Sequence, residues 1–414
     1  MTTIIIGASL SGLVTADQLK QRDPTRQVIV IDQVEAEDLR KKYTEKNAWE
    51  FFPLPAELKK LDFFWQTEVK QIDPATKTLI CWQGEQKLVV PYDQLVVATG
   101  SSYTPHQSKF SRYHNAYLYR AQEHYQLNQQ KFAPFKRIAI LGYDATSLQL
   151  ASQLVDQGKQ VSLLHYRNSV LFQFFDHEMI APFEQLLEKQ GIAYYPQATY
   201  CQAQTYREQI TALDLGCERI PVDCIVTFAP TFPNTKLLRG VVDLNDDLTV
   251  KTTEAFQTSQ PDLFAVGDIV AFREADGTNK YLPSLAWELQ TAKKVVQLLL
   301  AQESLTLEAA PFTVNVFDHF LASYGITQDL APYRGMSGVQ QTSYHFGKEA
   351  SWCGTLKTVF EPTDQRLLGV QVISRCPAET EFDTLTQLVR QKKTLSEALT
   401  TISRLFQRLD PIHS

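Results

Sequence analysis

Gly7, Ser9 and Gly12 have the spacing of a phosphate-binding turn. They fill the three positions of a G-x-G-x-x-G pattern between an apolar run, residues 4–6, and a segment with helical periodicity that ends near Leu19. In such a turn the first glycine permits a tight bend, the small middle residue lets a pyrophosphate approach the backbone, and the last glycine allows close helix packing. The phosphates then face the N-terminus of the helix. The pattern predicts a dinucleotide-binding turn, with a βαβ turn that holds no ligand as the alternative.

The elements that position this turn form a pattern that occurs twice. An apolar run, a glycine turn, a helical segment and a second apolar run begin at Thr3 and again at Arg137. The first copy ends in the run 28–31 and Asp32, whose carboxylate would hold ribose hydroxyls. The second copy has its turn at Gly142. Two βαβ units predict an α/β fold with buried parallel strands.

Later segments have other patterns. The apolar run 94–97 is closed by the tight turn Ala98-Thr99-Gly100, and the run 263–266 ends at Gly267-Asp268. From Phe312 onward, strand-like segments precede helical ones, and there is no glycine motif. This last part of the chain is therefore expected to form an α+β domain.

The composition is that of an ordinary globular protein. The 414 residues are 44% hydrophobic and 21% charged, and the formal net charge of −6 is spread over scattered residues of both signs. This balance disfavours a nucleic-acid partner. No stretch is long and apolar enough to cross a membrane, and the first apolar run lacks the basic region of a secretory signal. Six dispersed cysteines without zinc-ligand spacing lead us to expect reduced thiols, no metal site and a cytoplasmic protein.

Taken together, the motifs resemble the flavoprotein pyridine nucleotide-disulfide reductase superfamily, specifically its NADH oxidase, NADH peroxidase and coenzyme A disulfide reductase branch. The resemblance spans nearly the whole chain. Besides the first turn, four segments carry it: Ala98-Thr99-Gly100, Pro233-Asn234-Thr235, residues 261–268 and residues 312–326.

The resemblance implies two Rossmann-like domains, of the FAD- and NAD(P)-binding types, and a C-terminal α+β dimerisation domain. The FAD-binding domain would cover residues 1–112 and 241–308, and the NAD(P)-binding-like domain residues 113–240. Residues 309–414 would form the dimerisation domain of a homodimer, in which this domain completes the partner's active site. A small-molecule electron donor and a small-molecule acceptor are implied as well.

FAD is the cofactor that the resemblance implies. Asp268 would bind its ribityl chain or pyrophosphate region, Val69 would contact the adenine through its backbone, and Thr99 with Gly100 would close over the nucleotide. Taken alone, Thr99 also fits an ordinary turn at a strand end. The full set of implied FAD contacts is Gly7, Ser9, Leu10, Ser11, Gly12, Asp32, Val69, Ala98, Thr99, Gly100, Gly267, Asp268 and Leu285.

The redox cysteine of this branch is missing. Residues 33–66 contain no cysteine, and Leu10 stands where oxidase and peroxidase members place a histidine. A thiolate must reach both flavin and substrate, so thiol chemistry of the family type is not expected. The aligned position falls near Lys42, a candidate for stabilising anionic reduced flavin. Cys353 and Cys376 are the cysteines that would approach a partner's flavin, with buried, inert thiols as the alternative.

The second glycine turn departs from the family pattern. It keeps Gly142 but has Asp144 at the close-approach position and Ser147 at the third position. A carboxylate about 4 Å from a pyrophosphate would cost about 4 kcal/mol at an effective dielectric near 20, or about a thousandfold in affinity. The sequence therefore predicts a degenerate NAD(P)H site.

Two other segments bear on electron donors. His165-Tyr166-Arg167 stands where an NADH-specific member has an acid, so a bound nucleotide would be NADPH, and a solvated strand end is the alternative. Trp287 and Glu288 replace small residues beside the implied flavin. The indole either fills space that a substrate would use or belongs to the core.

Three functions follow from these features. The first is a FAD-dependent oxidoreductase resembling NADH oxidase, in which the flavin carries electrons without a cysteine relay. The second is a non-catalytic FAD-binding sensor or interaction protein. The third is a structural relic that binds no flavin.

Overall fold

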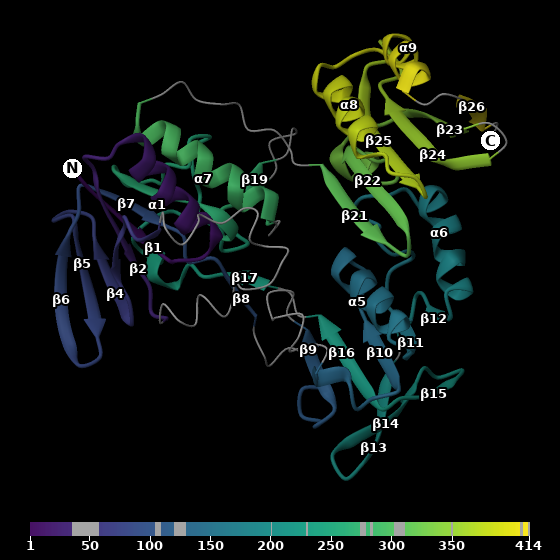
Figure 1. The fold of residues 1–414 in the computed structure, drawn as a ribbon, viewed down its shortest axis with the longest axis horizontal. Helices are drawn as coiled ribbons and strands as arrows, with labels where there is room; N and C mark the ends of the chain where they lie inside the picture. Colours follow the sequence, from purple (N-terminus) through teal and green to yellow (C-terminus); the bar gives the residue numbers. More distant parts are fainter. Residues whose placement is uncertain are drawn as a thin grey trace. The chain divides into compact units, whose positions relative to one another are not determined.

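The computed structural model describes residues 1–34, 58–103, 109–119, 130–199, 201–228, 231–273, 279–281, 285–301, 311–348, 351–405 and 409–412. Contacts divide the chain into two compact units. The first comprises Met1–Thr104, Gln122–Tyr125 and Pro230–Glu308, and the second comprises Pro105–Ala121, Gln126–Ala229 and Ala309–Ser414. Figure 1 shows their elements.

The first unit is built on a parallel five-stranded sheet with the order β18-β7-β1-β2-β3. Four of its strands, all except the edge strand β3, are almost fully buried on both faces, which explains their continuous apolar runs. The strands are β1 (Thr2–Ile6), β2 (Gln27–Ile31), β3 (Asp62–Phe64), β7 (Gln94–Val97) and β18 (Leu263–Ala265).

Two helices of this unit pack against each other, α1 (Leu10–Arg22) and α7 (Leu285–Leu299) (Figure 1). An antiparallel sheet of β4 (Thr67–Asp73), β5 (Thr78–Gln83) and β6 (Gln86–Pro91) packs its apolar residues into the same core. Short elements complete the unit: β8 (Ser101–Tyr103), β17 (Thr231–Pro233), β19 (Phe272–Arg273), β20 (Asn279–Lys280), and the 3-10 helices η3 (Lys236–Leu238) and η4 (Gly267–Ile269).

The second unit contains another parallel five-stranded sheet, with the order β12-β11-β10-β16-β9. Its strands are β9 (Ala116–Tyr119), β10 (Arg137–Leu141), β11 (Gln160–Leu164), β12 (Ile192–Tyr195) and β16 (Cys224–Phe228). The helices α5 (Ala145–Asp156) and α6 (His177–Lys189) and the antiparallel strands β13 (Gln202–Tyr206), β14 (Gln209–Asp214) and β15 (Arg219–Pro221) complete this part.

The last part of the chain forms an antiparallel six-stranded sheet with the order β21-β22-β25-β24-β23-β26. Helix α8 packs against this sheet and against α9. The elements are β21 (Phe312–Val316), β22 (His319–Gly325), η5 (Ala331–Arg334), β23 (Gln340–Lys348), β24 (Ser351–Phe360), β25 (Leu367–Ser374), α8 (Glu379–Arg390), α9 (Leu395–Leu405) and β26 (Leu409–Ile412).

The predicted fold class is confirmed, because two parallel α/β sheets are followed by an antiparallel sheet with helices. The three-domain division stays a prediction. In the structure, Val314 and Leu321 of the last part pack into the core of the second parallel sheet. Residues from Pro230 onward belong to the first unit, where β17 pairs with β8. No helix in the described ranges is long and apolar enough to span a bilayer.

Candidate dinucleotide site

The first turn has the backbone geometry that its glycines predict. Gly7 has φ +106°, and a Cβ there would overlap the carbonyl oxygen of Ala98. A Cβ on Gly12 would overlap the carbonyl oxygen of Gly7, so α1 approaches β1 too closely for any side chain. The turn lies at the carboxyl end of β1, between β7 and β2, which is where open α/β sheets bind ligands.

Asp32 follows the neighbouring strand β2 and contacts the turn. Its Oδ2 accepts a hydrogen bond from the backbone N–H of Ala8 at 2.6 Å, and its Oδ1 accepts one from Val34 at 3.0 Å. The carboxylate is thereby held beside the glycine turn. The predicted contact of Asp32 with ribose hydroxyls remains a prediction.

The end of β7 is fixed by Asn234, which belongs to one of the segments that carried the resemblance. Thr99 Oγ1 donates to the Asn234 carbonyl at 2.8 Å, and Asn234 Nδ2 donates to the Thr99 carbonyl at 2.9 Å. The Asn234 backbone N–H also donates to the Gly100 carbonyl at 2.9 Å. These bonds hold Thr99 and Gly100 at the same edge of the sheet as Gly7.

Asp268 lies in η4, just after β18, and one of its carboxylate oxygens has no hydrogen-bond partner in the part of the chain that the structure describes. It is 5% exposed, and its Oδ2 accepts a hydrogen bond from Ser101 Oγ at 2.7 Å. Its Oδ1 and the hydroxyl of Ser11, which is 1% exposed, have no partner among the described residues. Burial raises the pKa of Asp268, and the Ser101 hydrogen bond opposes that rise. Buried polar atoms without partners are costly, so this site suits a polar ligand that supplies the missing hydrogen bonds.

Glu288 is a site residue whose role the sequence did not predict. Burial and the negative charge of Asp268 raise the pKa of this carboxyl to about 8, while a hydrogen bond from the Ser11 backbone lowers it. The sequence feature that could have indicated this role is an acidic residue in the first turn of the helix that follows Gly267-Asp268. Neighbouring Trp287 is a core residue, because it is 3% exposed and its Nε1 donates to the Val270 carbonyl at 3.1 Å.

The second turn, in the other unit, carries its own carboxylate at the start of α5. Asp144 Oδ1 accepts a hydrogen bond from the Ser147 backbone N–H at 2.8 Å, and Ser147 Oγ donates to the Asp144 carbonyl at 2.7 Å. The aspartate is therefore an N-cap. It occupies an N–H group that a pyrophosphate would otherwise use.

His165 is buried, and the alternative of a solvated strand end is wrong for this residue. It is 5% exposed, and its Nε2 lies 2.8 Å from the hydroxyl of Tyr194, which donates to Glu184. Burial lowers the pKa of His165 to about 4, and a hydrogen bond from the imidazole to the Arg167 backbone opposes this change. The imidazole is therefore neutral at pH 7.

Arg167 supplies the positive charge at this strand end. Its guanidinium lies 4.7 Å from the ring centre of Tyr166 and 4.6 Å from that of Phe172. Tyr143, from the second glycine turn, packs against both rings. An arginine stacked on aromatic rings is therefore the cationic group beside the second turn.

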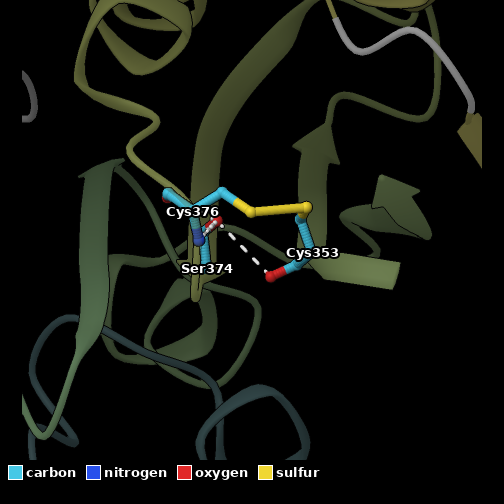
Figure 2. Close-up of a disulfide and its surroundings, with 3 residues drawn as sticks. All are labelled: Cys353, Ser374 and Cys376. Carbon is cyan, nitrogen blue, oxygen red and sulfur yellow. Dashed lines mark hydrogen bonds between the residues drawn. A yellow bond between two sulfur atoms is a disulfide. The ribbon is translucent and has the colours of Figure 1, made fainter. Parts of the chain in front are cut away.

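The expectation of reduced thiols is wrong for two of the six cysteines. Cys353 and Cys376 form a disulfide, which joins the start of β24 to the segment after β25 (Figure 2). The segment is held as well by Arg375, whose backbone N–H donates to the Cys353 carbonyl at 2.8 Å. The two cysteines are 23 residues apart in the sequence, and this separation did not indicate that they pair. Cys81 and Cys224 are buried free thiols whose pKa is raised by burial.

For the other predicted FAD contacts, the structure shows where the residues lie in the fold. Ser9 precedes α1, and Leu10 is buried in its first turn. Val69 lies on β4 and packs against the core, and its adenine contact stays a prediction. Lys42 and the side chain of Leu285 lie outside the described residues.

Comparison with known proteins identifies the family. Residues 1–294 match the family described as pyridine nucleotide-disulphide oxidoreductase. An NADH oxidase of Enterococcus faecalis is 25% identical over 373 residues, which cover 85% of this chain and 82% of that protein. An NADH oxidase of Lactococcus lactis is 21% identical and covers 96% of this chain and 94% of its own length.

A solved structure shows the same fold. The water-forming NADH oxidase from Lactobacillus brevis matches with a TM-score of 0.83 and 20% identity, over 96% of this chain and 92% of that one. The predicted resemblance, the oxidoreductase class and the FAD cofactor are confirmed by these matches. The chain belongs to the pyridine nucleotide-disulphide oxidoreductase family.

Proposed function

We propose that this chain holds FAD at the turn between β1 and α1 and transfers electrons to a small acceptor without a cysteine relay. The observation that carries the proposal is the pair of buried, unpartnered polar atoms beside the turn, Asp268 Oδ1 and Ser11 Oγ. A nucleotide bound across the first α1 turn supplies hydroxyl and phosphate groups to such atoms. FAD, when bound, supplies the hydride and electron chemistry that no side chain here provides.

Different residues would bind different parts of FAD. The turn from Gly7 to Gly12 leads into the first turn of α1, whose backbone N–H groups would donate to an anionic pyrophosphate. Asp268 accepts hydrogen bonds from ligand hydroxyls through Oδ1, while Ser101 keeps Oδ2 satisfied. Thr99 and Gly100, held by Asn234, close the edge of the site.

The absence of a cysteine in residues 33–66 supports a mechanism without thiols. Three of the four free cysteines, Cys81, Cys201 and Cys224, are buried, and burial raises the pKa of each thiol, whereas the fourth, Cys217, is exposed. A raised pKa disfavours the reactive thiolate. The proposed acceptor is oxygen or another small molecule, as the names of the NADH oxidase relatives suggest.

The proposed donor is NADPH rather than NADH. No acid stands at residues 165–167, and the guanidinium of Arg167 would attract a 2′-phosphate. Asp144 at the start of α5 weakens binding of either nucleotide. We therefore propose a weak donor site. From the family resemblance and the sequence, we also propose that the protein is a homodimer and cytoplasmic.

An anaerobic absorbance experiment tests this function. The purified full chain is treated with NADH and then with NADPH, and oxygen is readmitted at the end. We expect a flavin band that NADPH bleaches faster than NADH does, and that returns with oxygen. A flavin band that neither nucleotide bleaches would favour the sensor or interaction protein instead. A chain that shows no bound flavin after FAD is added would contradict FAD binding itself.

A further inference from the structure

A carboxyl of the chain itself lies at the start of α1, where the proposed pyrophosphate would bind. Glu288 extends from the first turn of α7, the helix that packs against α1, and its side chain lies beside Ser11 in the first turn of α1. The first N–H groups of a helix have no partner within the helix. The N–H of Ser11 belongs to this set, and a phosphate at the helix N-terminus would use it.

Contacts with η4 fix the position of Glu288. The Thr291 hydroxyl accepts a hydrogen bond from the Gly267 backbone N–H at 2.9 Å and donates to the Glu288 carbonyl at 3.0 Å. Gly267 has φ +77°, and a Cβ at this position would overlap the Ser11 hydroxyl and lie 3.9 Å from Glu288 Cγ. The glycine therefore leaves room for Ser11 and Glu288 to lie together.

The charges around Glu288 favour its neutral form. Asp268 on η4 is the charged side chain that acts on it among the described groups, and the first turn of α1 has no acidic residue. With a pKa near 8, Glu288 is largely neutral at pH 7 and largely anionic at pH 9. The anionic form would place a negative charge beside the first turn of α1, where it would repel a pyrophosphate.

We propose that Glu288 competes with the FAD pyrophosphate for the N-terminus of α1, so that FAD binds to the protein with a neutral Glu288 and binds more weakly once this carboxyl ionises. This inference rests on the proposed function, since it concerns affinity for the same cofactor. In this account Glu288 affects only the affinity for FAD and takes no part in electron transfer.

The test is the pH dependence of FAD affinity, measured by quenching of flavin fluorescence on the full chain freed of bound cofactor. When only the neutral form binds, the apparent Kd rises as its fraction falls, by about tenfold from pH 7 to pH 9. The Glu288→Gln variant has no ionisable group at this position. We expect its Kd to be the same at both pH values and, at pH 9, about tenfold lower than that of the unmodified chain.

Glu85→Gln is the matched control, because it makes the same chemical change at an exposed position of the same unit. We expect it to keep the tenfold rise. Glu288→Ala serves as a second variant without the ionisable group, and thermal melts of the FAD-free chains verify folding.

Three outcomes would overturn the inference. A Glu288→Gln chain whose Kd rises with pH as the unmodified chain does would contradict competition by Glu288. Loss of FAD binding in both Glu288 variants, with binding retained by the unmodified chain, would show that the carboxyl supports the cofactor. Absence of FAD binding in every chain at both pH values would refute the proposed function together with this inference.

Discussion

Replacing Asp144 by asparagine should strengthen NADPH binding at the second turn. The substitution removes one negative charge but keeps a side-chain oxygen that can accept from the Ser147 backbone N–H, now at 2.8 Å from Asp144 Oδ1. Asparagine is as good an N-cap as aspartate, so α5 should keep its stability. The variant therefore separates the effect of charge from the effect of capping.

The size of the effect follows from Coulomb's law. A phosphate oxygen that approaches the same N–H comes within about 4 Å of the carboxylate, where two like charges repel by about 4 kcal/mol at an effective dielectric of 20. Because about 1.4 kcal/mol corresponds to a tenfold change, the upper limit is about a thousandfold decrease in Kd. Solvent at the turn and salt reduce this figure, so a decrease of about tenfold or more is the expected result.

The assay is an anaerobic titration with NADPH, followed by the nucleotide's fluorescence. Asp156→Asn is the matched control, because Asp156 ends the same helix and lies away from the turn. We expect its Kd to equal that of the unmodified chain. An Asp144→Asn chain with the same Kd as this control would refute the idea that the carboxylate weakens the donor site.

Three other substitutions test the cofactor turn and the second unit. Gly12→Ala should abolish FAD retention, since a Cβ there would overlap a backbone oxygen, and the ratio of flavin to protein absorbance measures the loss. Lys357→Met should lower the free energy of unfolding by about 3–5 kcal/mol, because the Lys357 side chain is 1% exposed and its Nζ forms an ion pair with Asp176 Oδ2 at 2.7 Å. Urea denaturation measures this loss, and a loss below about 1 kcal/mol would contradict the prediction. Cys353→Ser should cost about 2–4 kcal/mol under oxidising conditions and nothing when a reductant is present, and equal stability of both chains without reductant would argue against the disulfide.

The first turn could be predicted because its signal is local. The φ of Gly7 and the close approach at Gly12 are requirements that a short stretch of sequence expresses by itself. The same holds for Asp144, whose conflict with a pyrophosphate was visible in the motif. What the motif did not show is that this carboxylate caps α5.

Contacts between distant segments could not be predicted in this way. Glu288 lies beside Ser11 of α1 because α7 packs on α1, which no spacing in the sequence reveals. The pairing of Cys353 with Cys376 depends on the register of β24 and β25. The ion pair between Lys357 of β24 and Asp176, the residue before α6, likewise joins segments that are far apart in the sequence.

The central claim is that Asp268 and its neighbours hold FAD at the turn between β1 and α1. The most direct test is a titration of the FAD-free full chain with FAD, compared with the Asp268→Ala variant. We predict one FAD per unmodified chain and a Kd at least about tenfold higher for the variant, since a hydrogen bond to a charged group contributes about 1.5–3 kcal/mol. Equal Kd values for the two chains, or no FAD binding by the unmodified chain, would contradict the account.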